Sequence, residues 1–226
     1  MEQTNKSTLT KKGDFIELKF TGLADGKIFD SNIPEDLKQI NDKATPEKTL
    51  VIIGQRMVVK GLDDYLEGKE LNKDYSISIN SKDAFGPRRT EFVRTMPLKI
   101  FHEQKIQPVQ GASFIFDNQL ARVIAVSGAR VTTDFNNPLA GKEITYKFTI
   151  SRIVHDLKEK TEAVCKLIFR YVPEISIEND SITLKGPKIL ENFINQSQGK
   201  FKEFLGREVS FKEAEDKKVE QDTPLL

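Results

Sequence analysis

The stretch FTGLADGKIFDS, residues 20 to 31, decides the fold of this chain. Residues 15 to 20 before it alternate apolar and polar side chains, which is the period of a strand with one buried face. Asp25-Gly26 then supplies a hairpin turn, because glycine tolerates positive φ. The pattern predicts two antiparallel strands that begin a small sheet.

The rest of this sheet is split along the sequence. Strand patterns recur near residues 50–53 and 75–79, and helical patterns recur near residues 35–40 and 58–66. A further alternating strand of the same type comes only at residues 144–154, well after the Ala84-Phe85-Gly86 run. Because that strand needs the earlier sheet as a partner, we expect one β domain that is interrupted by a guest domain.

Residues 88–137 form the predicted guest. They hold short apolar runs that are separated by turn signals at residues 110–111, 117–118 and 127–128. This pattern predicts a small, mostly β module with a thin core, since about fifty residues bury little surface.

A third module is expected after His155. Alternation over residues 165–171 is typical of a strand, and two apolar runs flank a turn at Asn179-Asp180. Helical spacing over Leu190 to Leu205 ends at Gly206, before a strand at residues 208–211. The last dozen residues are charged, and we expect them to be disordered.

Charge and cysteine content limit the partners. The 226 residues carry 35 Lys and Arg against 34 Asp and Glu, so no overall field recruits nucleic acid or a membrane surface. Cys165 is the single cysteine, which agrees with a reducing cytoplasm. The polar start of the chain does not resemble a signal peptide, so a cytoplasmic location is expected.

Metal and covalent chemistry find no candidate in the sequence. Two histidines and one cysteine, without ligand spacing, make a metal site improbable, and no phosphate loop or nucleophile motif occurs. We therefore expect no cofactor.

The ordered motifs carry a family resemblance. The run from Phe20 to Ser31, then Ile53-Gly54, VVKGL at 58–62 and DAFG at 83–86, resembles the FKBP-type peptidyl-prolyl cis-trans isomerases. DFNNPLAGK, residues 134–142, resembles the return segment of the SlyD-like branch, whose insert-in-flap chaperone module interrupts the FKBP domain. With the third module, the whole layout resembles the long archaeal FKBP type.

The resemblance implies an α+β protein, with an FKBP-like antiparallel sheet and a short helix in its first domain. Its domains would be an isomerase domain of residues 1–87 and 138–155, a chaperone insert of 88–137, and an α+β C-terminal domain of 156–226. The expected partners are unfolded or proline-containing polypeptides, and homodimerisation through the C-terminal domain is a further hypothesis.

Site residues follow by motif from the same resemblance. The catalytic group would be Phe20, Asp30, Phe85 and Tyr146. Substrate would also contact Phe29, Val58, Val59, Leu62, Val93, Met96 and Phe101, and the Val59 N–H would hold a substrate carbonyl. An apolar pocket suits the chemistry, because rotation about an X-Pro bond needs neither nucleophile nor metal.

Two readings stay open from the sequence. Many family members have tyrosine where Phe20 and Phe85 stand, so hydroxyl donors are missing here, and a non-catalytic holdase chaperone that uses the FKBP domain as a scaffold remains the alternative. The apolar residues of the insert form either its core or a sticky surface for unfolded chains.

Overall fold

The computed structural model describes residues 9–214, and the disorder expected for the last dozen residues lies outside this range. The first sheet has the order β2-β1-β9-β4, and β3 pairs with β1. All of its pairings are antiparallel. Its strands are β1 (Phe15–Ala24), β2 (Lys27–Ser31), β3 (Thr49–Ile52), β4 (Asp74–Ile79) and β9 (Ile144–Ile153). The late strand β9 therefore lies at the centre of the sheet, as the split pattern predicted.

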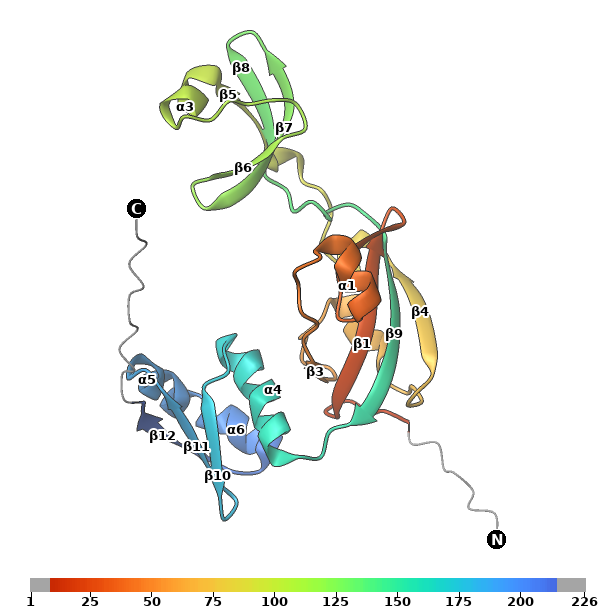
Figure 1. The fold of residues 1–226 in the computed structure, drawn as a ribbon, viewed down its shortest axis with the longest axis vertical. Helices are drawn as coiled ribbons and strands as arrows, with labels where there is room; N and C mark the ends of the chain where they lie inside the picture. The colour runs from red at the N-terminus through yellow and green to blue at the C-terminus, as the bar shows by residue number, and fades with distance from the viewer. Residues whose placement is uncertain (1–8, 215–226) are drawn as a thin grey trace.

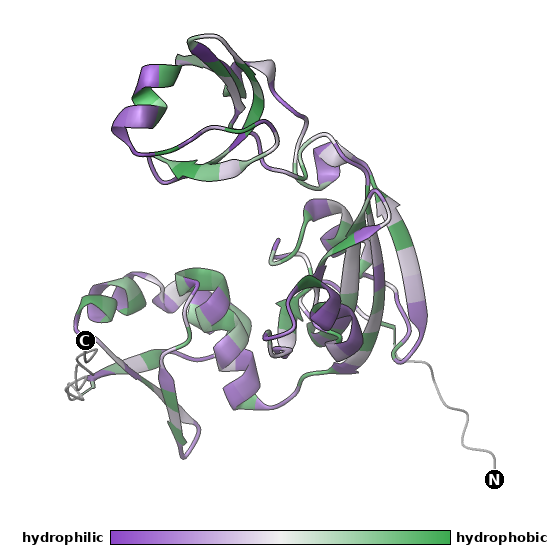
Figure 2. Ribbon diagram, turned by 45° about the horizontal axis from the view of Figure 1, so that its top comes forward, coloured by the Kyte–Doolittle hydropathy of each residue, from purple (hydrophilic) through white to green (hydrophobic). Residues whose placement is uncertain are grey.

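The alternating pattern of β1 explains its place in the core. Ile16 and Leu18 are fully buried, whereas Lys19 between Leu18 and the half-buried Phe20 is exposed. Figure 2 shows such alternation as green and purple bands along the strands. At the end of β1, Asp25 and Gly26 have φ of 51° and 73° and form the predicted hairpin turn.

Two short helices accompany this sheet, α1 (Pro34–Ile40) and α2 (Lys60–Tyr65). Helix α2 lies very close to β4, because a Cβ at Gly61 would stand 2.4 Å from Cγ2 of Ile79. A larger residue at position 61 would force the Ile79 side chain or the helix to move.

Residues 88–137 contain a separate four-stranded sheet of order β5-β8-β7-β6. Its strands are β5 (Val93–Pro97), β6 (Ser113–Phe116), β7 (Gln119–Ser127) and β8 (Arg130–Asp134). Helix α3 (Leu98–Glu103) was not predicted, and it brings Phe101 onto the sheet beside the buried Val123 and Val131. A short 3₁₀ turn, η2 (Thr90–Phe92), precedes the sheet, and another, η1 (Ser81–Asp83), follows β4.

The strand that was expected over residues 165–171 is wrong. Residues 165–169 of this segment belong to helix α4 (Leu157–Phe169), which Arg170 ends in the left-handed conformation. The Asp156 side chain caps the helix by accepting a hydrogen bond from the Glu159 N–H at 2.9 Å. Thr161, Val164 and Cys165 are buried at helical spacing. Packing of this helical face therefore decides the structure, although residues 165–171 alternate as a strand would.

The remaining elements surround a small third sheet. In it, β10 (Glu174–Glu178) and β11 (Ser181–Gly186) pair antiparallel across the predicted turn, and β12 (Val209–Glu213) runs parallel to β11. The single helix expected over residues 190–205 is two helices, α5 (Ile189–Gln196) and α6 (Gln198–Leu205). Ser197, with φ −100° and ψ 4°, makes the break, and Gly206 ends α6 as predicted.

The C-terminal part packs directly on the first sheet. One hydrophobic cluster contains Phe15 and Ile52 of that sheet together with Ala163 of α4 and other buried residues of the C-terminal part. The prediction of an α+β fold is confirmed, while the exact domain boundaries stay a prediction, since this core crosses the expected boundary after residue 155.

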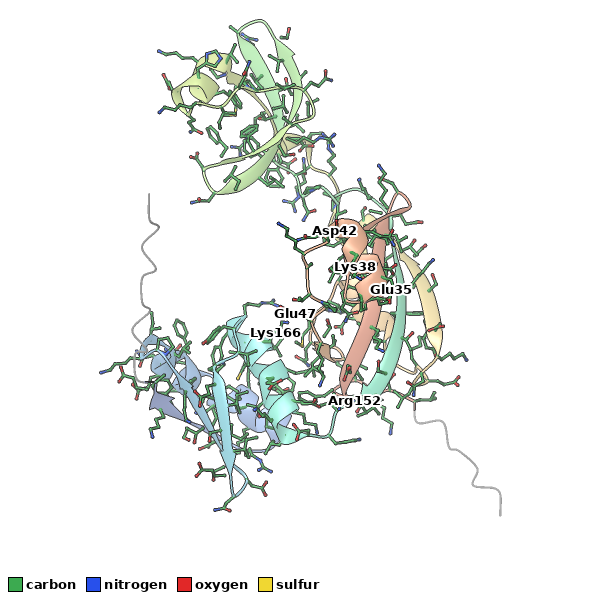
Figure 3. The ribbon with its side chains drawn as sticks, in the orientation of Figure 1. Glu35, Lys38, Asp42, Glu47, Arg152 and Lys166 are labelled. Atoms are coloured by element: carbon green, nitrogen blue, oxygen red, sulfur yellow. The ribbon has the colours of Figure 1, made fainter. Side chains whose placement is uncertain are left out.

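An ion-pair cluster joins the same two parts. Arg152, at the end of β9 in Figure 3, lies 2.8 Å from a carboxylate oxygen of Glu17 on β1 and 2.9 Å from one of Glu159 on α4. Lys48 also pairs with both glutamates. The hydrogen bonds from Arg152 and Lys48 lower the pKa of Glu159 to about 2.

Figure 1 shows the insert standing apart from the other two sheets, joined to the first by two adjacent linkers. The Gly141 N–H donates to the Gly86 carbonyl at 2.8 Å, and the Asn136 side chain bonds both the N–H and the carbonyl of Arg89. Across residues 9–214, no helix combines the length and apolar character needed to cross a bilayer.

Candidate active site

Four aromatic rings from distant parts of the chain meet on one side of the first sheet; we call Phe20, Phe29, Phe85 and Tyr146 the aromatic cluster. The ring centroids of Phe29 lie 5.6 Å from Phe85 and 6.0 Å from Tyr146, both edge to face. Phe20 lies 6.1 Å from Tyr146. Tyr146 is buried and the three phenylalanines are half-buried, so part of the ring surface stays open to a ligand.

Gly22 makes this close approach of the rings feasible. A Cβ at this position would stand 2.7 Å from Cζ of Phe29 and 3.0 Å from Cε1 of Tyr146. Gly22 lies on β1, between β2, which carries Phe29, and β9, which carries Tyr146. It is paired with Asp30 on β2 and with Tyr146 on β9. Sequence reasoning gave Gly22 no role, although it stands in the FTG motif.

The start of α2 forms the apolar floor beside the rings. Leu62 is 1% exposed, whereas Val58 and Val59 are half-buried and pack against the same core. The Val59 carbonyl begins α2 by accepting from the N–H groups of Leu62 and Asp63. The Val59 N–H has no acceptor among residues 9–214, which leaves it available for the substrate carbonyl that the family motif implies.

A buried carboxylate fixes the loop before this floor. Asp63 is 1% exposed, and its two oxygens accept from the N–H groups of Gly54 and Arg56 at 2.9 Å each. Two backbone donors and the nearby Arg56 guanidinium compensate the buried charge. Asp63 is thus a supporting residue that the sequence analysis missed.

Asp30 lies next to the aromatic cluster at the end of β2. Loss of hydration raises the pKa of its carboxyl group, and the hydrogen bond from the Ser31 N–H opposes this only in part. Burial also raises the pKa of the Tyr146 phenol, and the negative charge of Asp30 adds to that rise. The charge of Asp30 therefore acts on the phenol of Tyr146, which supplies the one hydroxyl of the cluster.

Side chains that follow Asp30 hold Phe20 in place. Asn32 accepts from the Phe20 N–H at 2.8 Å and donates to the Leu18 carbonyl at 2.7 Å. The Ser31 hydroxyl donates to the Phe20 carbonyl at 2.9 Å. These bonds continue the pairing of β1 beyond the last residue of β2, and no pattern in the sequence indicated them.

The structure separates the predicted binding residues of the insert. Val93 and Met96 are half-buried on β5, but Phe101 is 0% exposed in the core, where it packs edge to face on Phe114. The expected contact between Phe101 and substrate is therefore corrected, because no part of its ring reaches the surface. Apolar residues that are exposed on the insert are Phe92, Val109, Ile115, Leu120 and Val126.

Comparison with known proteins matches both parts of this description. The family model described as the IF domain of FKBP26 matches residues 94–139. A short-type peptidyl-prolyl cis-trans isomerase of Methanocaldococcus jannaschii is 30% identical over 146 residues, which cover 63% of this chain and 91% of that protein. The chain belongs to the FKBP-type peptidyl-prolyl cis-trans isomerases.

Bacterial members of the family are also similar. The FKBP-type isomerase SlyD of Aeromonas hydrophila is 25% identical over 126 residues, covering 54% of this chain and 58% of that protein. SlyD of Vibrio cholerae is 27% identical over 111 residues, covering 46% of this chain and 54% of that protein. The predicted SlyD-like character and the assignment as a prolyl isomerase are confirmed.

Proposed function

We propose that this FKBP-type isomerase rotates X-Pro bonds in unfolded or partly folded polypeptides, which its insert holds near the aromatic cluster. The isomerase class follows from the relatives. The capture of substrate by the insert, the roles of individual residues, a cytoplasmic location and a homodimer are proposals.

The aromatic cluster supports the catalytic part. Rotation about an X-Pro bond breaks amide resonance, against a barrier of roughly 18 to 20 kcal/mol. A twisted amide is less dipolar than a planar one, so surroundings that exclude water favour the transition state over the ground state. The edge-to-face rings and the buried Leu62 provide such surroundings, and the Val59 N–H provides a donor.

The role of Asp30 is electrostatic in this proposal. Asp30 is exposed as a residue, but partial loss of hydration at its carboxyl group raises its pKa. Because Phe20 and Phe85 lack hydroxyl groups, Tyr146 is the ring of the cluster that can donate a hydrogen bond toward substrate or toward Asp30.

Exposed apolar residues support capture by the insert. Ile115 is 69% exposed and Leu120 is 50% exposed, while the buried hydrophobic cluster of the insert contains just Phe101, Val123 and Val131. A thin core with apolar residues outside it suits the binding of varied unfolded segments. Binding there raises the concentration of X-Pro bonds near the cluster without any tight contact at the cluster itself.

A proline-peptide isomerisation assay tests the catalytic part. Wild type accelerates the reaction, and both Asp30→Ala and Phe85→Ala reduce kcat/KM, whereas the control Tyr171→Ala does not, since that ring is 51% exposed on the C-terminal part. A wild-type rate equal to the uncatalysed rate would support the holdase alternative.

Two exposed residues of α5 support the proposed homodimer. Ile189 and Phe193 are 71% and 53% exposed, and they lie one helical turn apart on the same face. Light scattering on the full chain tests this: Phe193→Asp gives the monomer mass and the neighbouring Asn192→Asp does not. A monomeric wild type rejects the dimer.

The single cysteine supports the proposed cytoplasmic location. Cys165 has no second cysteine with which to form an internal disulfide, which agrees with a reducing compartment. It is fully buried, and burial raises the pKa of its thiol to about 12, so the thiol is unreactive. Cell fractionation tests this location, and recovery of the chain in an exported fraction contradicts it.

A further inference from the structure

Two adjoining cavities lie where the insert meets its linkers, away from the aromatic cluster. One measures about 580 Å³ and the other about 480 Å³, and both are lined by Leu120, Asn136, Asn137 and Pro138. Since they share these residues, we treat them as one groove, called the linker groove. Its residues come from both linkers and from β5, β6, β7 and β8.

The two halves of the linker groove differ in character. The second cavity is largely apolar and is lined by Phe92, Leu120 and Phe135, with the Arg94 guanidinium 5.5 Å from the centroid of the Phe135 ring. The first cavity is more polar. Its charged lining residues are Arg88, Arg122, Asp134 and Lys142.

The carboxylate of Asp134, the acidic residue of the groove, already has hydrogen-bond partners within the protein. One oxygen of Asp134 accepts two hydrogen bonds from Arg88, at 2.7 and 3.0 Å. The other accepts from the backbone and side-chain N–H groups of Asn136. These donors lower the pKa of Asp134, although desolvation opposes them, so it stays charged and engaged.

Within the polar half of the groove, Arg122 is the cation without a counter-charge. It is directly opposite Asp134 in the β7–β8 pairing, but within residues 9–214 its guanidinium lies in no ion pair, because Asp134 pairs with Arg88. Lys142, the third cation of this half, pairs with Asp25 at 2.9 Å. The polar half therefore presents an excess of positive charge.

The charge of the insert points the same way. Residues 88–137 contain seven Lys and Arg against four Asp and Glu, a net charge of +3, although the whole chain carries only +1. The remainder of the chain is therefore slightly acidic. Positive charge is concentrated in the part of the molecule that carries the exposed apolar residues.

We propose that the linker groove binds extended apolar segments of unfolded chain that carry an acidic residue, with the acidic side chain paired to Arg122 and an apolar neighbour against Phe92 and Phe135. This rests on the proposed capture function and names the substrate class that it favours. Electrostatic complementarity of this kind selects among segments more than it adds affinity.

The place of the groove suits delivery to the isomerase site. Arg88 lines the groove and follows Phe85 of the aromatic cluster by three residues. Because an extended chain advances by at most about 3.6 Å per residue, the two Cα atoms lie within roughly 11 Å. The edge of the groove that Arg88 lines therefore lies near the cluster.

Peptide fluorescence tests the proposal, because the chain has no tryptophan and a tryptophan in the peptide reports on binding alone. The probes are three unstructured apolar peptides without proline, identical except for Glu, Gln or Lys at one central position. For the intact wild-type chain, we expect the Glu peptide to bind about three- to fivefold more tightly than the Lys peptide, the size of a partly exposed ion pair.

Arg122→Glu removes or reverses this order. Arg130→Glu keeps it, because this exposed residue of β8 makes the same change in net charge outside the groove. Arg122→Gln adds no negative charge opposite Asp134, and it makes the affinities for the Glu, Gln and Lys peptides equal. If this variant binds the Gln peptide as tightly as wild type does, its linker groove is intact.

Equal binding of the three peptides by wild type overturns the charge selection and leaves the capture function standing. Equal effects of Arg122→Glu and Arg130→Glu overturn the groove as its origin. If no peptide binds to wild type, the capture function fails together with this inference.

Discussion

The first sheet and the insert both pack aromatic rings against an antiparallel sheet, but the first sheet leaves its rings partly open above a large core, whereas the insert buries its central ring, Phe101, and exposes aliphatic residues. Phe20, Phe29 and Phe85 rest on a buried layer that includes Ile16, Leu18, Val51, Ile53, Leu62, Ile144 and Ile150. In the insert, Phe101, Val123 and Val131 are the buried hydrophobic residues of its cluster, and apolar residues such as Ile115 and Leu120 face outward.

This difference shows what a buried layer of core residues does for the side chains that pack on it. A densely packed layer holds ring edges at fixed positions, which a site needs if it is to favour one twisted geometry of an amide. A thin core leaves apolar side chains free to contact segments of many shapes. The same residue types therefore serve a fixed site in one region and an adaptable surface in the other.

The largest expected effect breaks the thin core. Phe101→Ala removes its central ring and costs about 3 to 5 kcal/mol, which is comparable to the whole stability of a small module. We expect hydrogen exchange over residues 94–134 to lose its protection, while turnover of a short proline peptide stays unchanged. The control Phe92→Ala, at a 36% exposed ring, leaves that protection in place. A matching loss of peptide turnover in Phe101→Ala would show that the two regions are not separable.

The next effect disturbs the fixed rings. In Gly22→Ala, the new methyl group stands 2.7 Å from Phe29 and forces that ring or β1 to move. Such overpacking costs about 1 to 3 kcal/mol, and we expect kcat/KM for a short proline peptide to fall about tenfold. The control Gly199→Ala meets nothing within 4 Å and changes neither quantity. Unchanged turnover in Gly22→Ala would mean that the positions of the rings do not govern catalysis.

A smaller effect concerns the support behind the first sheet. The pKa of Glu159 is lowered from 4.5 to about 2 in the folded state, so its ion pairs stabilise the fold fully above about pH 4.5. This stabilisation is lost as the pH falls toward 2. Because the side chain is 22% exposed, we expect Glu159→Gln to cost about 1 to 2 kcal/mol at pH 6.

Urea unfolding measures this contribution. The difference between wild type and Glu159→Gln narrows between pH 4.5 and pH 2, whereas Glu203→Gln, at an exposed position of α6, behaves as wild type. A difference that does not depend on pH would exclude the ion pairs as its source.

Much of the fold was predictable where local signals and burial agree. The hairpin of β1 and β2 follows from alternating residues and from Asp25-Gly26, whose positive φ the structure has. The secondary structure of the α4 segment was predicted wrongly, because the short alternating run of residues 165–171 is also compatible with the C-terminal end of a helix. The Asp156 cap and the burial of Thr161, Val164 and Cys165 decide for the helix.

The site was predictable only in part for a related reason. Phe29 and Tyr146 carry motif signals, but the support from Asn32, Asp63 and Gly22 depends on contacts that only the folded chain makes. Phe101 was misplaced because an apolar residue in a short module reads equally well as core or as surface, and the unpredicted helix α3 turns it inward.

The division of labour between the two regions is tested most directly by removing the insert. Deleting residues 88–137 is geometrically feasible, because Gly141 and Gly86 are hydrogen-bonded at 2.8 Å and no deleted residue belongs to the core of the first sheet. We predict that kcat/KM for a short proline peptide stays within about twofold, while catalysis of a proline-limited refolding reaction falls at least about tenfold, since linked binding no longer concentrates the substrate. Equal losses on both substrates, or undiminished catalysis of refolding, would contradict the account.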